Sequence, residues 1–196
     1  MKSSRALGLA LGVLLAACNQ KAQVEKEPTP LEAKAAAVPA HKFAAPDSFK
    51  VGLGKVFEGY ERMESALAHD DFPKAKEAFH SMHGLLHVVQ TDGLDSSGKA
   101  YWDSLDASIM EILHPMAAAQ DIAGMRDHFG EFSAQIIDAL EKFGAISQLR
   151  AFQFHCPMAK DNQGADWLQR DTIMLNPYFG NSMLKCGNLV EEIQLN

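Results

Sequence analysis

Apolar residues recur at steps of three and four along residues 47–143, and this spacing constrains the fold more than any other feature of the sequence. The repeat predicts four amphipathic helices, which run from Asp47 to just before His69, from Asp71 to about Asp92, from about Lys99 to Ala119 and from Asp121 to about Phe143. Pro73 falls in a first turn, where proline is tolerated, whereas Pro115 should kink or restart the third helix. Short connections between such helices favour an antiparallel four-helix bundle.

The residues after 147 do not continue this repeat. Residues 148–154 alternate weakly between polar and apolar, as a strand does, and the sequence after His155 is rich in turn-forming residues. The predicted fold class is therefore mainly α: a four-helix bundle with an extended, turn-rich C-terminal tail packed on it, and with room in the tail for one short hairpin. Residues 47–196 form a single domain in this prediction.

The N-terminal residues have the features of a secretory signal peptide. Two positive charges precede an apolar run that is too short to span a bilayer. The run ends in LAAC at 15–18, which resembles the lipobox of bacterial lipoproteins. We therefore expect residues 1–17 to be removed and Cys18 to become a lipidated first residue. Asn19 is not the Asp that resembles an inner-membrane retention signal, which favours an outer-membrane anchor facing the periplasm.

Residues 18–46 are predicted to be a disordered tether between the lipidated Cys18 and the domain. Prolines and alanines dominate this stretch, and it has few large apolar side chains to bury. Loss of the signal peptide leaves 16 of the 18 basic residues against 25 acidic ones, so the net charge changes from −7 to −9. No segment combines clustered Lys and Arg with aromatic residues, so we expect a membrane contact through the lipid anchor and no nucleic-acid partner.

Each of two short segments of the tail carries one cysteine and one methionine. Cys156 and Met158 are two residues apart, which places them on one face of an extended segment, and Met183 and Cys186 are three apart, which places them on one side of a helical turn. Thiolate and thioether sulfurs form a soft ligand set that selects Cu(I) over calcium, magnesium or manganese. His155 adds an imidazole beside the first pair. These residues are candidate copper ligands.

The two cysteines have a second interpretation. In an oxidising compartment Cys156 and Cys186 are an even pair, for which a disulfide is the ordinary outcome. Closing a loop of this size would contribute roughly 3 to 4 kcal/mol. The two interpretations are compatible if an oxidised form rests and a reduced form binds metal, since metal binding needs deprotonated thiols. The residues alone leave this choice open.

Three histidines form a separate candidate group. His80, His83 and His87 fall on one strip of the second predicted helix, beside its apolar face. His83 and His87 are four residues apart and can share a metal ion, and imidazole suits copper and zinc. If this helix packs against the tail, the strip lies near His155 and Cys156 and the ligands form one site. Half-exposed histidines that only form hydrogen bonds are the alternative.

The two tail segments also resemble a known family. HCPMAKDNQGADWL at 155–168 and NPYFGNSMLKCG at 176–187 are similar to sequences of the bacterial periplasmic domain-of-unknown-function family number 3347, which also occurs fused to the adaptor subunits of copper and silver efflux pumps. The resemblance is specific in 155–187 and general in 47–145, where it is a helical region of suitable length. It implies an association with heavy-metal handling.

We therefore predict a periplasmic lipoprotein that binds copper as Cu(I), or silver, and buffers it or hands it to a heavy-metal efflux adaptor or another envelope protein. The candidate metal ligands are Cys156, Met158, Met183, Cys186, His155, His80, His83 and His87. The alternative is a disulfide-stapled helical domain that binds an envelope protein and no metal. We do not expect an enzyme, because adjacent His and Cys side chains on an extended chain point apart and the cysteines do not form a C-x-x-C motif.

Overall fold

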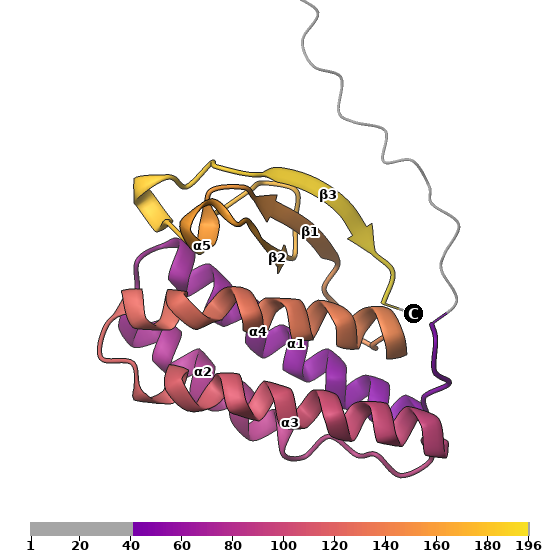
Figure 1. Cartoon of the computed structure of the whole chain (residues 1–196). Helices are drawn as coiled ribbons and strands as arrows, with labels where there is room; N and C mark the ends of the chain where they lie inside the picture. Colours follow the sequence, from indigo (N-terminus) through magenta and orange to yellow (C-terminus); the bar gives the residue numbers. More distant parts are fainter. Residues whose placement is uncertain (1–40, 196) are drawn as a thin grey trace, which may run out of the picture. The chain divides into compact units, whose positions relative to one another are not determined.

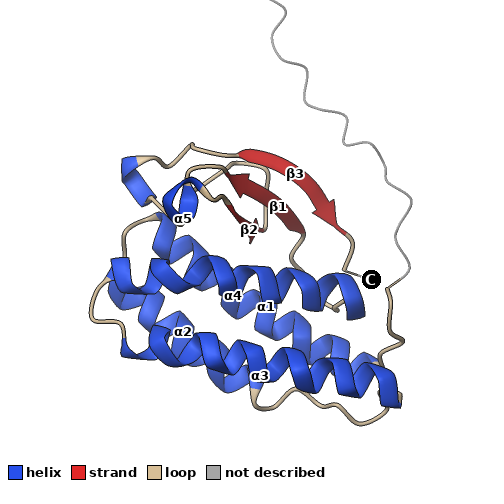
Figure 2. Cartoon of the chain, in the orientation of Figure 1, coloured by secondary structure: helices blue, strands red, loops and turns tan. Residues whose placement is uncertain are grey.

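The computed structural model describes residues 41–195 (Figure 1). The predicted signal peptide at 1–17, the lipidation site Cys18 and most of the predicted tether at 18–46 lie outside these residues. The described residues contain four long helices, α1 (Asp47–Ala68), α2 (Phe72–Leu86), α3 (Ser96–Ala118) and α4 (Ile122–Phe143), and three strands, β1 (Ala151–Cys156), β2 (Ala165–Gln169) and β3 (Asn188–Ile193) (Figure 2). The short helix α5 (Ala159–Asn162) and the 3-10 turn η1 (Gly180–Ser182) lie between the strands.

Aspartates define where three of the helices begin. Asp71, Asp95 and Asp121 precede α2, α3 and α4, and each carboxylate accepts the backbone N–H of the third residue after it, at 3.1, 2.7 and 2.9 Å. Such a cap satisfies one of the amide groups that a helix leaves unpaired at its N-terminus. The helix starts are therefore encoded locally, by one residue each.

The end of α2 and the effect of Pro115 differ from the sequence prediction. α2 ends at Leu86 instead of near Asp92, although Val89 is partly buried against the core. An apolar residue can be buried from a turn as well as from a helix, so the apolar repeat continues past the helix end. Pro115 does not restart α3, which continues to Ala118. It lies in the last turn, where its missing N–H removes one helical hydrogen bond.

The four helices form a bundle, and the sheet covers one side of it. α1 packs against α2 and α4, and α3 packs against α2 and α4. The sheet lies on α4 and α1, mainly through β2, so that α2 and α3 lie on the side of the bundle away from it (Figure 1). This arrangement confirms the predicted fold class, a mainly α four-helix bundle with the C-terminal tail packed on it.

The tail contains more regular structure than the single hairpin for which the prediction left room. β1 is the central strand and pairs antiparallel with both β2 and β3. The register places Phe154 opposite Trp167 and His155 opposite Asp166. Because side chains alternate between the faces of a sheet, Phe154, Trp167 and Cys156 share one face while His155 and Asp166 share the other.

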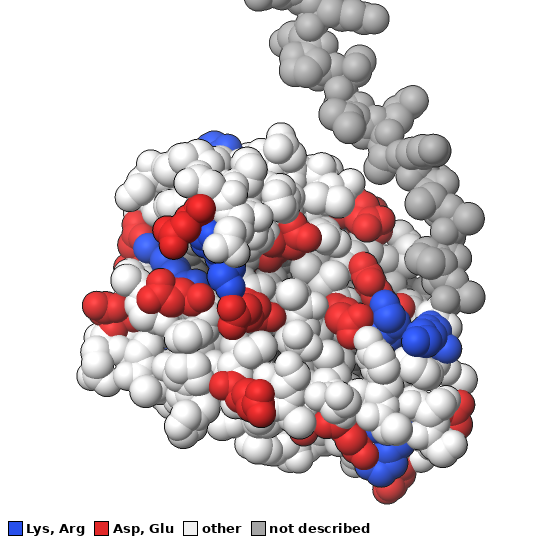
Figure 3. Space-filling model, viewed as in Figure 1, with Lys and Arg blue, Asp and Glu red and all other residues white. Residues whose placement is uncertain are grey.

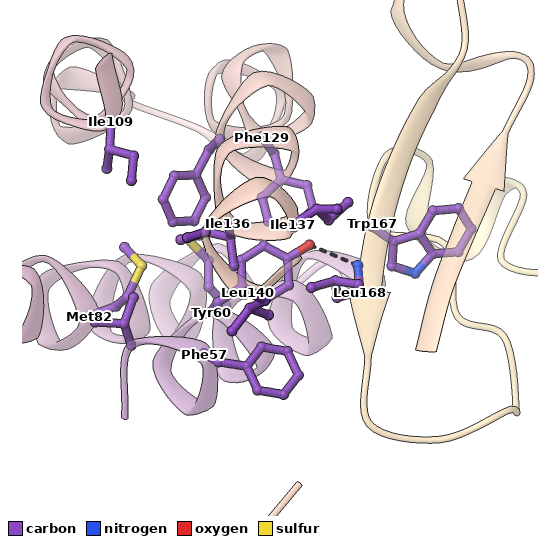
Figure 4. Packing of buried hydrophobic residues seen from close by; sticks show 14 of the residues in the cluster. Phe57, Tyr60, Met82, Ile109, Phe129, Ile136, Ile137, Leu140, Trp167 and Leu168 are labelled. Carbon is purple, nitrogen blue, oxygen red and sulfur yellow. Dashed lines mark hydrogen bonds between the residues drawn. The ribbon is translucent and has the colours of Figure 1, made fainter. Parts of the chain in front are cut away.

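Tyr60 of α1 joins the helical bundle to the sheet (Figure 4). Its ring is fully buried, and its hydroxyl accepts the backbone N–H of Leu168 in β2 at 3.1 Å and donates to Ser133 of α4 at 2.6 Å. Burial raises the pKa of this hydroxyl, so it stays protonated and can donate. In Figure 4 Leu168 points toward the helices, whereas Trp167 points away from them. The outer face of the sheet therefore needs a second cover, which the loop after β2 supplies.

The packed part of the chain begins a few residues before α1. The ring of Phe43 stacks on Phe143 with centroids 5.2 Å apart, and its backbone N–H donates to the carbonyl of Lys142 at 3.0 Å. Residues directly before Asp47 therefore contact the ends of the helices, although they fall inside the predicted tether.

Candidate metal centre

Cys156 and Cys186 meet on the outer face of the sheet. Their Sγ atoms lie 3.8 Å apart, and both are free thiols. Cys156 ends β1 and is fully buried, whereas Cys186 is half-buried in the turn before β3. Burial raises the pKa of the Cys186 thiol, and the neighbouring Cys156 adds to the rise. The structure thus brings together two sulfurs from segments that are 30 residues apart in the sequence.

The separation of the two sulfurs is close to that of two ligands on one ion. At the zinc–sulfur bond of about 2.3 Å, two thiolates at the tetrahedral angle lie about 3.8 Å apart. A disulfide bond is about 2.05 Å long, so its formation requires the sulfurs to approach each other by somewhat less than 2 Å. The donor atoms therefore fit a shared soft metal ion with little movement.

Asn176 holds the turn that carries Cys186. Its side chain is fully buried, and Nδ2 donates to the carbonyl of Cys186 at 2.6 Å. Oδ1 accepts the backbone N–H groups of Tyr178 at 2.8 Å and Phe179 at 3.2 Å. One side chain therefore joins the residues directly after Asn176 to the end of the loop at Cys186.

Gly187 allows this loop to approach the sheet closely. Its φ is +143°, and a Cβ there would lie 2.8 Å from Cη2 of Trp167 and 2.9 Å from the carbonyl oxygen of His155. The same position lies 3.0 Å from Sδ of Met174. Met174 was not among the predicted ligands, because it stands outside both cysteine–methionine pairs, yet its thioether lies beside the residue that follows Cys186.

The two predicted thioether ligands are placed differently. Met183 is half-buried and its carbonyl accepts the N–H of Cys186 at 2.9 Å, so these two residues share one turn, as the spacing suggested. Met158 is 43% exposed and has helical backbone angles, φ −93° and ψ −11°. β1 ends at Cys156 and Pro157 begins a turn. The segment is therefore not extended through Met158, and the expected shared face is absent.

Arg126 of α4 fixes the middle of the loop. Its guanidinium donates to the carbonyls of Pro177 at 2.8 Å and Leu67 at 2.5 Å, and it lies 2.6 Å from a carboxylate oxygen of Asp70. The second carboxylate oxygen accepts the N–H of Asn181 at 3.0 Å. The hydrogen bond from Arg126 lowers the pKa of Asp70. The loop is thus tied to the helices about half-way between β2 and Cys186.

His155 faces away from the cysteine pair. Its Nδ1 lies 2.5 Å from a carboxylate oxygen of Asp166. Both line a groove of about 430 Å³ along α4, together with Lys160, which pairs with Glu131. The predicted ligand His155 is therefore near Cys156 in sequence but on the opposite face of β1.

The second predicted group lies at the end of α2. The Nε2 atoms of His83 and His87 are 3.2 Å apart, with His83 half-buried and His87 exposed. Burial lowers the pKa of His83, and the neighbouring His87 and His80 lower it further. His80 is exposed and meets the ring of Phe79 edge-on at 5.3 Å. The structure therefore pairs two of the three histidines directly.

The histidine strip and the cysteine pair do not form one site. α2 packs against α1 and α3, whereas the sheet packs mainly on α4 and α1. The expectation that α2 packs against the tail is wrong, because α1 and α4 separate the two (Figure 1). Among residues 41–195, no three His, Cys, Asp or Glu side chains converge on a point that could hold a metal ion.

Comparison with known families identifies the helical part of the chain. A family model described as a protein of unknown function (DUF3347) matches residues 56–148. Residues 56–148 belong to this family. The prediction of the family from the sequence is confirmed, although the match covers the helices, where the resemblance was general, and not the tail strings at 155–187. No curated protein and no solved structure matches the chain.

Only one of the two candidate ligand groups lies inside the segment that the DUF3347 model matches. The histidines of α2 lie inside the matched segment, and Cys156 and Cys186 lie beyond its end. The family description assigns no function to either group. Function must therefore be argued from the chemistry of the side chains.

Charge on the surface does not single out a third site. On the face shown in Figure 3, basic side chains lie beside acidic ones, in keeping with ion pairs such as Lys142–Asp138 and Lys99–Asp103.

None of the helices in residues 41–195 has the length and apolar character needed to cross a membrane.

Proposed function

We propose that this protein binds a soft monovalent metal ion, Cu(I) or Ag(I), between Cys156 and Cys186. The observation that carries the proposal is the pair of free thiols, whose sulfurs are 3.8 Å apart, one at the end of β1 and one in the turn before β3. Thiolates prefer soft ions, and a site of two thiolates with thioethers has no oxygen ligand to favour calcium or magnesium.

Thioethers would complete the coordination. Met183 shares a turn with Cys186, and Met174 lies against Gly187. Met158 follows Cys156 by two residues and is exposed, so it is free to turn toward the ion or toward a partner. Cu(I) is tolerant of two to four sulfur ligands of mixed type, which is consistent with methionines at different degrees of burial around one buried thiol.

The cellular role follows from the N-terminal sequence. We propose that a lipid at Cys18 anchors the protein in the envelope, outer membrane favoured, with the domain in the periplasm. There it would buffer the ion or hand it to a heavy-metal efflux adaptor or an assembly partner. Partial exposure of Cys186 supports transfer, since a ligand on the partner can reach that sulfur. We propose no enzymatic role, because His155 and Cys156 lie on opposite faces of β1.

A competition titration tests the proposal. The full chain, reduced under nitrogen, is titrated with Cu(I) in the presence of a chromogenic Cu(I) chelator, with Cys156→Ala, Cys186→Ala and Met183→Leu variants beside it. We expect one ion per chain, and each cysteine variant should lose more affinity than the roughly 10- to 100-fold that removal of a second-shell partner costs. Met110→Leu, in α3, is the matched control and should bind as the wild type does. Cu(I) affinity equal to that of the wild type in both cysteine variants would refute the proposal.

The same pair of thiols supports a second candidate function. Two thiols 3.8 Å apart can also close into a disulfide, which would make the tail a stapled surface for binding an envelope protein without metal. Counting thiols in protein purified from the periplasm without reductant distinguishes the two. A disulfide that neither reductant nor copper alters supports the stapled domain, and two reactive thiols support the metal site.

A further inference from the structure

The pair of histidines on α2 has a geometry of its own that the cysteine site does not use. His83 and His87 are one helical turn apart, and their Nε2 atoms lie 3.2 Å from each other. At metal–nitrogen bonds of about 2.0–2.1 Å, two imidazoles at the tetrahedral angle place their nitrogens about 3.3 Å apart. The last turn of α2 and the residue after it therefore already hold the two nitrogens at the separation that one ion requires.

A carboxylate with an unpaired oxygen lies on the facing helix. Asp106 of α3 is half-buried, and its Oδ1 is inaccessible to solvent and has no hydrogen-bond partner among the described residues. Buried oxygens without a partner are rare in folded proteins and call for an explanation such as an ion or a water. Burial raises the pKa of Asp106, and the nearby imidazole of His87 opposes that rise. The carboxylate therefore lies near enough to His87 for the two charges to interact.

We propose that His83, His87 and Asp106 form a second metal site, which takes a borderline divalent ion, Cu²⁺ or Zn²⁺. Two imidazoles and one carboxylate are a ligand set for these ions and a poor one for Cu(I) or Ag(I), which prefer sulfur. No three such side chains converge in residues 41–195, so the two imidazoles are the ligands already in place. The proposal requires Asp106 to turn toward them, with water in the remaining position. The site stands independently of the proposed function, because α1 and α4 lie between it and the cysteines.

The test isolates this site from the thiols. In the full chain carrying Cys156→Ala and Cys186→Ala, Zn²⁺ binding is measured by calorimetry and Cu²⁺ binding by electron paramagnetic resonance. We expect one ion of either kind, with nitrogen hyperfine structure from two imidazoles in the Cu²⁺ spectrum. His83→Ala and His87→Ala should each weaken binding at least about 10-fold, and Asp106→Asn should weaken it less. His128→Ala, a half-exposed histidine of α4, is the matched control and should change nothing.

Three results would overturn the inference: Zn²⁺ affinity unchanged in His83→Ala/His87→Ala, a Cu²⁺ spectrum without nitrogen ligands, or equal losses in the His128→Ala control. Circular dichroism verifies that each variant is folded, and His87→Gln replaces His87→Ala if the latter is not. Cu(I) titration of the same histidine variants in the wild-type background should match the wild type. The experiments therefore distinguish a failure of this inference from a failure of the proposed thiol site, because each site is tested with its own variants and its own ion.

Discussion

The helical bundle and the C-terminal sheet are stabilised by different kinds of contact. In the bundle, apolar side chains recur on one face of each helix and the backbone hydrogen bonds are local. In the tail, buried polar side chains bond to the backbone of the irregular loop that follows β2. Gln169, for example, accepts the N–H of Leu175 at 3.1 Å and donates to the carbonyls of Asp171 and Ile173, both at 2.8 Å. Asn176 does the same for the turn at Cys186.

This difference makes the two regions respond differently to substitution. A helix position can be filled by many residues of similar propensity, because the periodic pattern is redundant. An irregular loop held by one amide side chain has no substitute for it, because the backbone groups that it pairs become unsatisfied. The geometry of the cysteine pair depends on the second kind of contact.

The largest effect is expected for Asn176→Ala. Removal of this side chain leaves the carbonyl of Cys186 and the N–H groups of Tyr178 and Phe179 without their partner. At about 1–3 kcal/mol for a buried group left unpaired, urea denaturation should show a loss of about 3 kcal/mol or more, and Cu(I) affinity should fall with it. Asn188→Ala, an exposed asparagine at the start of β3, is the control. Equal stability of the two variants would contradict the role given to Asn176.

Two glycine-to-alanine substitutions, one in each region, should change the stability of the protein in opposite directions. Gly187→Ala places a Cβ against Trp167 and the His155 carbonyl at a positive φ, so it should destabilise the protein by about 1–3 kcal/mol. Gly84→Ala lies in α2 with no atom within 4 Å of the new Cβ, so it should stabilise the protein by about 0.5–1 kcal/mol. Thermal unfolding of both variants measures the difference. A change in stability in the same direction for both variants would contradict the proposed difference between helices and tail.

The smallest effect concerns the junction of the two regions and depends on pH. Burial raises the pKa of Glu64 in α1 well above its ordinary 4.5, and the charges of Glu61 and Asp171 raise it further. Between the ordinary and the raised pKa the folded state binds more protons than the unfolded one, so stability falls as pH rises through that window. Glu64→Gln removes this contribution, so the variant should lose less stability than the wild type between pH 5 and pH 8.

Chemical denaturation at a series of pH values checks this prediction. Below the ordinary pKa of 4.5 both states of the wild type carry a protonated Glu64, so the variant and the wild type should converge in their pH dependence. Glu77→Gln, an exposed glutamate of α2, serves as the control substitution. Parallel curves for the wild type and Glu64→Gln across the whole range would show that the buried carboxyl is not linked to folding.

The helices could be predicted from the sequence because their signals are local. The apolar repeat and the helix starts at Asp71 and Asp121 are each readable within a few residues, whereas α3 begins at Ser96 and not at the predicted Lys99. The i,i+4 spacing of His83 and His87 predicted their proximity. The end of α2 was misplaced because Val89 is buried from a turn. Asp106 could not be found by the same reasoning, since it comes from another helix and its place depends on how the helices pack.

The tail was less predictable because its order depends on long-range pairing. Spacing along the chain revealed two cysteine–methionine pairs, but the contact between Cys156 and Cys186 depends on the sheet register and on the loop that Asn176 closes. Met174 gave no signal, because neither motif contains it. An asparagine before a proline indicates a turn, but it does not show which carbonyl the asparagine side chain reaches.

The coordination shell of bound Cu(I) tests the central claim most directly. X-ray absorption at the copper edge is measured on the full chain loaded with one equivalent of Cu(I), and on the Cys156→Ala/Cys186→Ala variant. The account predicts a first shell of sulfur alone in the wild type, and loss of that shell in the variant. A wild-type shell of nitrogen or oxygen, or a sulfur shell that survives removal of both cysteines, would contradict it.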